Sequence, residues 1–136
     1  MLQLMTWSEI IENFKLEGDL KMAAIFDSNG EKIAGTDGVT ITSSEAISIW
    51  KSLVTISNDV YSLFLMESKF SCFPVDNDTL IGQSKSDVIV ARKSQNLLIC
   101  AVSGLNSKKS CLATVKNFAG RLVEEGTPGV PVDSLI

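Results

Sequence analysis

The chain has 136 residues, 45% hydrophobic and 21% charged, so it is long enough for one globular domain, and no apolar run reaches the ~18 residues of a membrane span. Its net charge of −4 argues against nucleic acid and against anionic lipids, phosphoinositides included, as main partners, because both require clustered Lys and Arg. The sequence has no histidine and three cysteines without a C-x-x-C pair, which excludes the usual zinc sites and histidine-dependent nucleophilic catalysis.

We therefore expect no catalytic residues, no metal site and no cofactor. Cys72, Cys100 and Cys111 are interpreted as small buried apolar residues. The N-terminal segment lacks a basic stretch and reaches Glu9 too early for a signal peptide, so a cytoplasmic protein is expected.

The first predicted element is a helix over about residues 7–15. Thr6 and Glu9 form a capping-box pattern, and apolar residues then recur at helical spacing from Trp7 to Phe14. Residues 16–19 are expected to end the helix. The apolar run 21–26 and residues 31–35 then flank an Asn29-Gly30 pair, which predicts a β-hairpin because both residues tolerate a positive φ.

A second helix is predicted from a second capping box, Thr42 to Glu45, to about residue 54. Trp50 lies within it and is interpreted as a core residue. Three strand candidates follow at residues 60–66, 69–73 and 79–82, separated by polar residues typical of turns.

Residues 88–90 and 97–102 are short apolar runs joined by a polar turn, and they predict a hairpin in the middle of the sheet. From Cys111 to Leu122 an apolar stripe at helical spacing predicts a last helix that lies on this sheet. Strands so close in sequence must pair antiparallel. We predict an α+β fold with a central antiparallel sheet of about seven strands, in one domain over residues 1–126, and a flexible tail over 127–136.

Two lysines, Lys108 and Lys109, fall in the first turn of the last helix, where the helix dipole is positive. Each charge in this position costs about 0.3–1 kcal/mol at an exposed site. They indicate either a partner with an acidic patch or charges that serve solubility alone.

Several segments, in the same order, resemble the profilin family. Residues 6–11 (TWSEII) are similar to its first helix, residues 23–30 to its Ala-Ala-Ile…Asp-Gly hairpin, and residues 41–45 (ITSSE) to the entry of its second helix. Residues 80–99 follow its late hairpin, and residues 111–126 follow its terminal helix. The resemblance implies that the first and last helices cover one face of the sheet and the middle helix the other.

The resemblance also implies a cytoskeleton-associated protein that binds monomeric actin and regulates filament nucleation and elongation. The implied actin-binding residues are Lys69, Ser71, Phe73, Arg92, Lys108 and Lys109. Pro74 stands where the family carries a basic residue, which implies weaker binding.

A second implied site, for proline-rich peptides, lies between the terminal helices. Its counterparts here are Trp7, Ile10, Ile33, Asn117 and Arg121. Only Trp7 keeps the stacked aromatic character that polyproline recognition uses, so weak or absent binding is expected. The alternative for Trp7 is a purely structural anchor between the two helices.

A different interpretation of the same element order is a roadblock/longin-like scaffold, which dimerises or docks small GTPases. The extra late hairpin and Trp7 favour the profilin interpretation, in which the chain acts as a monomer. A stable homodimer in solution would favour the scaffold.

Overall fold

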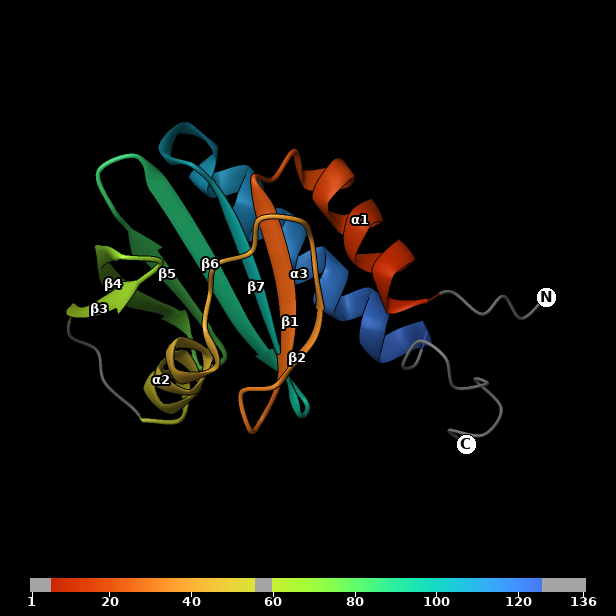
Figure 1. Cartoon of the computed structure of the whole chain (residues 1–136), viewed down its shortest axis with the longest axis horizontal. Coiled ribbons are helices and arrows are strands. Elements are labelled where there is room, and N and C mark those ends of the chain that lie inside the picture. The colour runs from red at the N-terminus through yellow and green to blue at the C-terminus, as the bar shows by residue number, and fades with distance from the viewer. Residues whose placement is uncertain (1–5, 56–59, 126–136) are drawn as a thin grey trace.

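The computed structural model describes residues 6–55 and 60–125, the last three without their side chains. Its seven antiparallel strands form one sheet in the order β2-β1-β7-β6-β5-β4-β3 (Figure 1), with the late hairpin β6–β7 in the middle, as predicted. The elements are α1 (Trp7–Gly18), β1 (Met22–Asp27), β2 (Lys32–Gly35), α2 (Ser43–Val54), β3 (Tyr61–Leu65), β4 (Ser68–Asp76), β5 (Thr79–Gln83), β6 (Asp87–Ser94), β7 (Leu97–Gly104), a 3-10 turn (Leu105–Ser107) and α3 (Lys108–Glu125). The predicted tail over 127–136 lies outside the described residues.

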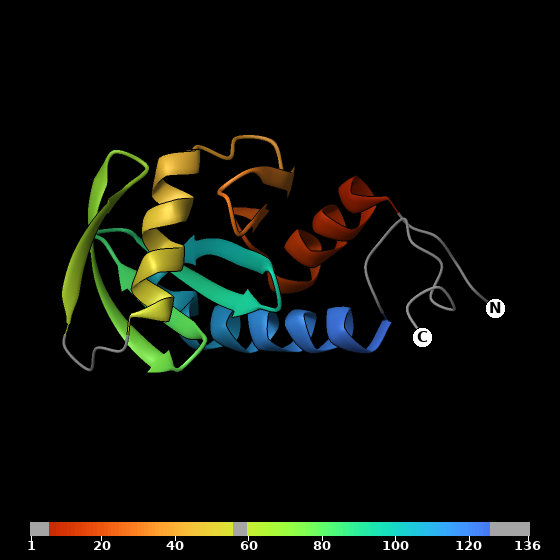
Figure 2. The ribbon, with the colours of Figure 1, turned by 90° about the horizontal axis from the view of Figure 1, so that it is seen from below.

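Two separate apolar clusters lie on the two faces of the sheet, because neighbouring residues of a strand point to opposite sides. The first cluster contains Ile25 and Ile99 of the sheet with Phe14 of α1 and Phe118 of α3. The second contains the alternate strand residues together with Ile49 of α2. Helices α1 and α3 therefore cover one face and α2 the other, as predicted, and α2 and α3 run in clearly different directions (Figure 2).

The capping box of α1 is confirmed, since the Thr6 hydroxyl accepts a hydrogen bond from the Glu9 N–H at 3.1 Å. The helix continues to Gly18, past the predicted bound near residue 15, and ends within the segment 16–19 that was expected to terminate it. Asp19 takes a left-handed conformation (φ 49°) and its N–H donates back to the carbonyls of Leu16 and Lys15. This C-cap satisfies the last carbonyls without a glycine at the cap position, so the sequence gives only a weak signal for it.

The capping box of α2 is also confirmed, and its Glu45 carboxylate has a further role. It accepts hydrogen bonds from the Met66 N–H at 3.2 and 3.3 Å. Met66 and Glu67 form the turn between β3 and β4, and both have positive φ (51° and 63°). The turn predicted at residues 67–68 is thus one residue too late, and Glu45 ties the true turn to the start of α2.

β4 extends past its predicted end at residue 73, through Pro74. Proline has no N–H to donate to a neighbouring strand. The pairing of β3 with β4 reaches only Cys72, so at Pro74 no hydrogen bond to β3 is lost. The pairing of β4 with β5 then shifts between Pro74 and Asp76, as in a β-bulge. This shift decides the direction of the Asp76 side chain.

The β1–β2 hairpin turns at Gly30, which adopts φ +84°, whereas Asn29 does not take a positive φ. A Cβ atom on Gly30 would lie 2.7 Å from Ile47 Cγ1 and 2.8 Å from the Ser43 carbonyl oxygen of α2. Position 30 therefore requires glycine, both for its positive φ and for the space that a Cβ atom would need. Trp50 of α2, predicted as core, is half-buried against the second cluster, with Lys93 Nζ 5.8 Å from the ring centroid.

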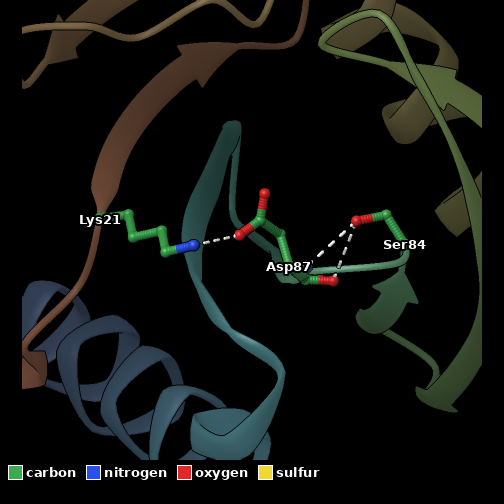
Figure 3. Close-up of polar contacts among 3 residues, drawn as sticks. All are labelled: Lys21, Ser84 and Asp87. Carbon is green, nitrogen blue, oxygen red and sulfur yellow. Dashed lines mark hydrogen bonds and ion pairs between the residues drawn. The ribbon is translucent and has the colours of Figure 1, made fainter.

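An ion pair joins Lys21, just before β1, to Asp87 at the start of β6, across the intervening β7 (Figure 3). The Asp87 N–H donates to the Ser84 hydroxyl at 3.1 Å, and the Ser84 N–H donates to the Asp87 carbonyl at 2.9 Å. These contacts hold the end of the sheet beside which α3 begins.

Cys72, Cys100 and Cys111 are buried and free, as predicted. Burial raises the thiol pKa of Cys72 to about 11 and that of Cys100 to about 12, and it also raises the pKa of Cys111. The three thiols are therefore protonated at neutral pH and act as apolar packing groups. Among the described residues, no helix combines the length and apolar character needed to cross a membrane.

Candidate functional site

β4 places a row of side chains on the face that carries α3. Phe70 and Cys72 point into the second cluster, so Lys69, Ser71 and Phe73 point to the opposite face. Phe73 pairs with Ile81 of β5 and packs partly against the first cluster, whereas Lys69 and Ser71 are exposed. The alternation of β4 thus gathers the three predicted residues of this strand on one surface.

The start of α3 meets this row at Phe73. Lys108, the first residue of α3, lies with its Nζ 5.9 Å from the centroid of the Phe73 ring, within reach of a cation–π interaction. Lys108 is half-buried there, while its neighbour Lys109 is exposed. The two lysines therefore differ: Lys108 covers an aromatic ring, and Lys109 points its charge to solvent.

Arg92 of β6 lies between the strands and α3. Its Nη1 donates to the Thr79 hydroxyl at 2.6 Å and lies 3.6 Å from Asp76 Oδ2. Lys116 of α3 approaches the same Asp76 oxygen to 3.4 Å. Asp76 is therefore a carboxylate placed between two cations from different elements.

The environment of Asp76 favours its charged form. Burial acts to raise its pKa, but hydrogen bonds from the Asp78 N–H, Thr79 and Lys116, together with the charge of Arg92, lower the pKa below its usual value. Asp76 is thus ionised at neutral pH. It offsets part of the positive charge on this surface.

The sequence reasoning missed three residues of this surface: Lys116, Asp76 and Phe64. Lys116 follows Lys109 by seven residues, a spacing that places both on one side of a helix and could have revealed it. Phe64 of β3 is 67% exposed and pairs with Lys69, so it projects on the same face. We call these residues, with those predicted, the basic face: Phe64, Lys69, Ser71, Phe73, Asp76, Arg92, Lys108, Lys109 and Lys116.

The seam between α1 and α3, where the second site was predicted, is filled by side chains. Phe14 and Phe118 stack with ring centroids 4.2 Å apart. Arg121 forms a bidentate ion pair with Glu17, in which the Nη1–Oε1 hydrogen bond measures 3.1 Å. The Arg121 guanidinium also lies 5.9 Å from the centroid of the Phe118 ring. This pair joins the two helices across the seam.

The other residues predicted for the second site lie around this seam. Trp7, Ile10 and Ile33 are partly buried and pack against the first cluster, while Asn117 is exposed. Trp7 is the one aromatic residue of the predicted set. Its contacts fit a structural anchor as well as they fit a peptide platform.

A cavity of about 460 Å³ lies at the C-terminal end of α2. Its walls include Leu53 of α2, Tyr61, Pro74 and Leu80 of the sheet, and Lys93. Burial raises the pKa of the Tyr61 hydroxyl, so this group stays neutral. No group of three or more His, Cys, Asp or Glu side chains that could hold a metal ion occurs in the described part of the chain.

The sequence matches the family model Profilin over residues 5–127. No curated protein matches it significantly.

The fold is similar to solved structures of low sequence identity. Acanthamoeba castellanii profilin IB gives a TM-score of 0.78 at 16% identity, over 90% of this chain and 100% of that one. LokiProfilin1 gives 0.70 at 19% identity, over 85% and 94%. LokiProfilin2, solved in complex with rabbit actin, gives 0.67 at 15% identity, also over 85% and 94%.

Proposed function

Since this chain belongs to the profilin family, we propose that it binds monomeric actin and regulates filament nucleation and elongation through its basic face. The observation that carries the proposal is a surface with five basic side chains from β4, β6 and α3, on which Lys108 lies over Phe73 and Arg92 and Lys116 flank Asp76, in a chain whose net charge is −4. Charge concentrated against the overall sign is typical of a surface that meets a partner of opposite charge. LokiProfilin2, a protein of this fold, has been solved with rabbit actin on it.

The mechanism is steric and needs no catalytic group. A monomer whose one end is covered by this protein cannot join a spontaneous nucleus or add to a filament through that end. Phe64 and Phe73 supply apolar contact area, and the surrounding Lys and Arg supply steering and orientation. The proposal includes action as a monomer in the cytoplasm, in association with the cytoskeleton, and it does not include phosphoinositides as a main partner, because the net charge is −4.

The residues assigned to the contact are those of the basic face. Lys69, Ser71, Phe73, Arg92, Lys108 and Lys109 come from the family resemblance, and Phe64 and Lys116 are added from the geometry. Pro74 restricts the chain beside Phe73 and supplies no charge, so binding is proposed to be weaker than a more basic strand would give.

A pyrene-actin polymerisation assay tests the proposal. The wild-type protein is expected to lengthen the nucleation lag of monomeric actin in a dose-dependent way. Phe64→Ser is expected to weaken binding about tenfold, because it removes an exposed aromatic side chain that a partner would bury.

The matched control is Leu16→Ser, which removes an exposed apolar residue (77%) from α1, away from the basic face. It should leave binding unchanged, and both variants should fold like the wild type because the replaced side chains are exposed. An unchanged lag at saturating wild-type protein contradicts the proposed function. Equal binding by the Phe64 variant contradicts only the role of Phe64.

For proline-rich peptides we propose weak or absent binding at the α1–α3 seam. A polyproline groove requires several stacked aromatic faces, and here Trp7 stands among Ile10, Ile33, Asn117 and Arg121. The Glu17–Arg121 ion pair and the Phe14–Phe118 stack occupy the seam itself. Titration with a long polyproline peptide, followed by tryptophan fluorescence, is expected to give no saturable change below millimolar concentration. Saturation at micromolar peptide would show a working groove.

The roadblock/longin-like scaffold remains the second candidate by element order, but no contact described above favours it. The family match over residues 5–127 supports the profilin interpretation instead. A stable homodimer seen by sedimentation would support the scaffold.

A further inference from the structure

Asp76 stands out on the basic face as a carboxylate among cations. Its Oδ2 lies 3.6 Å from Arg92 Nη1 and 3.4 Å from Lys116 Nζ, and its side chain is 39% exposed. The two cations come from β6 and α3, which pack against each other and both contribute to the surface assigned to actin. The carboxylate therefore occupies the place where two elements of this surface join.

Of the two ion pairs of Asp76, the one with Arg92 is loose, and both are partly exposed. The 3.6 Å separation from Arg92 exceeds hydrogen-bond distance, and exposed pairs of this kind contribute little to stability. The Arg92 Nε is buried and has no hydrogen-bond partner among the described residues, so only the outer part of the guanidinium faces the surface. The hydrogen bond of Arg92 Nη1 goes to the Thr79 hydroxyl, so the contact between Arg92 and Asp76 is one of charge alone.

We infer that Asp76 is an internal substitute for a carboxylate of the partner: it occupies the position between Arg92 and Lys116 that an acidic side chain of actin takes on binding. This inference rests on the proposed function. On binding, the partner's carboxylate displaces Asp76 from the two cations, and Asp76 lowers the affinity because it must be displaced and because it repels the incoming charge. Asp76 is therefore a residue that sets the strength of binding.

The opposite role, in which Asp76 orients Arg92 and Lys116 for the partner, predicts the opposite sign. If Asp76 only oriented the cations, its neutralisation would weaken binding. If Asp76 competes with the partner, its neutralisation strengthens binding. A single substitution therefore separates the two roles.

Asp76→Asn is suited to this test. The Asp78 N–H donates to Asp76 Oδ1 at 2.9 Å, and an asparagine oxygen can accept the same hydrogen bond, so the β4–β5 turn is retained. The matched control is Asp78→Asn, which changes the net charge equally in the same turn. Asp78 is not part of the pairing with Arg92 and Lys116.

The experiment measures the Kd of each protein for monomeric rabbit muscle actin at fixed low ionic strength. We expect Asp76→Asn to bind about three- to tenfold more tightly than the wild type, and Asp78→Asn to change Kd by less than about twofold. Adding Lys116→Gln to Asp76→Asn should remove much of the gain, because one of the released cations is then absent.

Equal or weaker binding by Asp76→Asn overturns the inference while leaving the proposed function intact. An equal gain in affinity for Asp78→Asn overturns it as well, and so does a gain that persists fully when Lys116→Gln is added to Asp76→Asn. In either case the gain would come from the change in net charge and not from the release of Arg92 and Lys116. If the wild type and all variants fail to bind actin, the proposed function fails and the inference fails with it.

Discussion

The double variant Lys108→Glu, Lys116→Glu is expected to bind monomeric actin about 100-fold more weakly than the wild type, a loss of about 2.7 kcal/mol in binding free energy. Lys108 lies over Phe73, and Lys116 lies at the cation pair around Asp76, so both reversed charges fall inside the proposed contact. Reversal replaces attraction to an acidic partner with repulsion. Pyrene-actin assays over a range of protein concentrations measure the effect.

The folded state should tolerate this change. A glutamate at position 108 lies in the first turn of α3, where a negative charge is favourable, so unfolding free energy should fall little. The control variant is Lys32→Glu, Lys51→Glu, which changes the net charge equally at exposed sites on β2 and α2. If both double variants lose binding equally, long-range charge and not the basic face is responsible. If neither loses binding, the assigned contact is wrong.

Phe14→Ala is expected to lower the free energy of unfolding by about 3–5 kcal/mol. Phe14 is 1% exposed and its ring stacks on Phe118, so truncation leaves a cavity between α1 and α3 and removes an aromatic pair. Because the two helices share this contact, the whole first cluster is loosened. Urea denaturation followed by far-UV circular dichroism measures the change.

Leu16→Ala on the same helix is the matched control, since Leu16 is 77% exposed. Its unfolding free energy should stay within about 0.5 kcal/mol of the wild type. A loss below about 1 kcal/mol for Phe14→Ala would mean that α1 contributes little to the cooperative core.

The existence and order of the elements could be predicted from the sequence, because capping boxes and apolar spacing are local signals. The ends of the helices and strands were harder to predict. The extension of α1 to Gly18 depends on the left-handed Asp19, and the β3–β4 turn depends on positive φ at Met66 and Glu67. Both are conformations that non-glycine residues adopt only when surrounding contacts favour them, and sequence spacing does not record those contacts.

The candidate surface was predictable where the strand is regular and not where it is irregular. In a regular strand alternate residues share a face, so Lys69, Ser71 and Phe73 of β4 lie together. Regular alternation would place Val75 on this face and Asp76 on the opposite one. The register shift between Pro74 and Asp76 reverses this parity and brings Asp76 to Lys116 of α3. The position of Phe64 beside Lys69 likewise follows from strand pairing that no single segment reveals.

The carboxylate of Glu45 connects the start of α2 to the outer hairpin of the sheet. The Glu45 carboxylate accepts from the Thr42 N–H at the start of α2 and also from the Met66 N–H, in the turn that joins β3 to β4. A change at this one carboxylate is therefore expected to affect both the first turn of α2 and the β3–β4 turn beside Phe64.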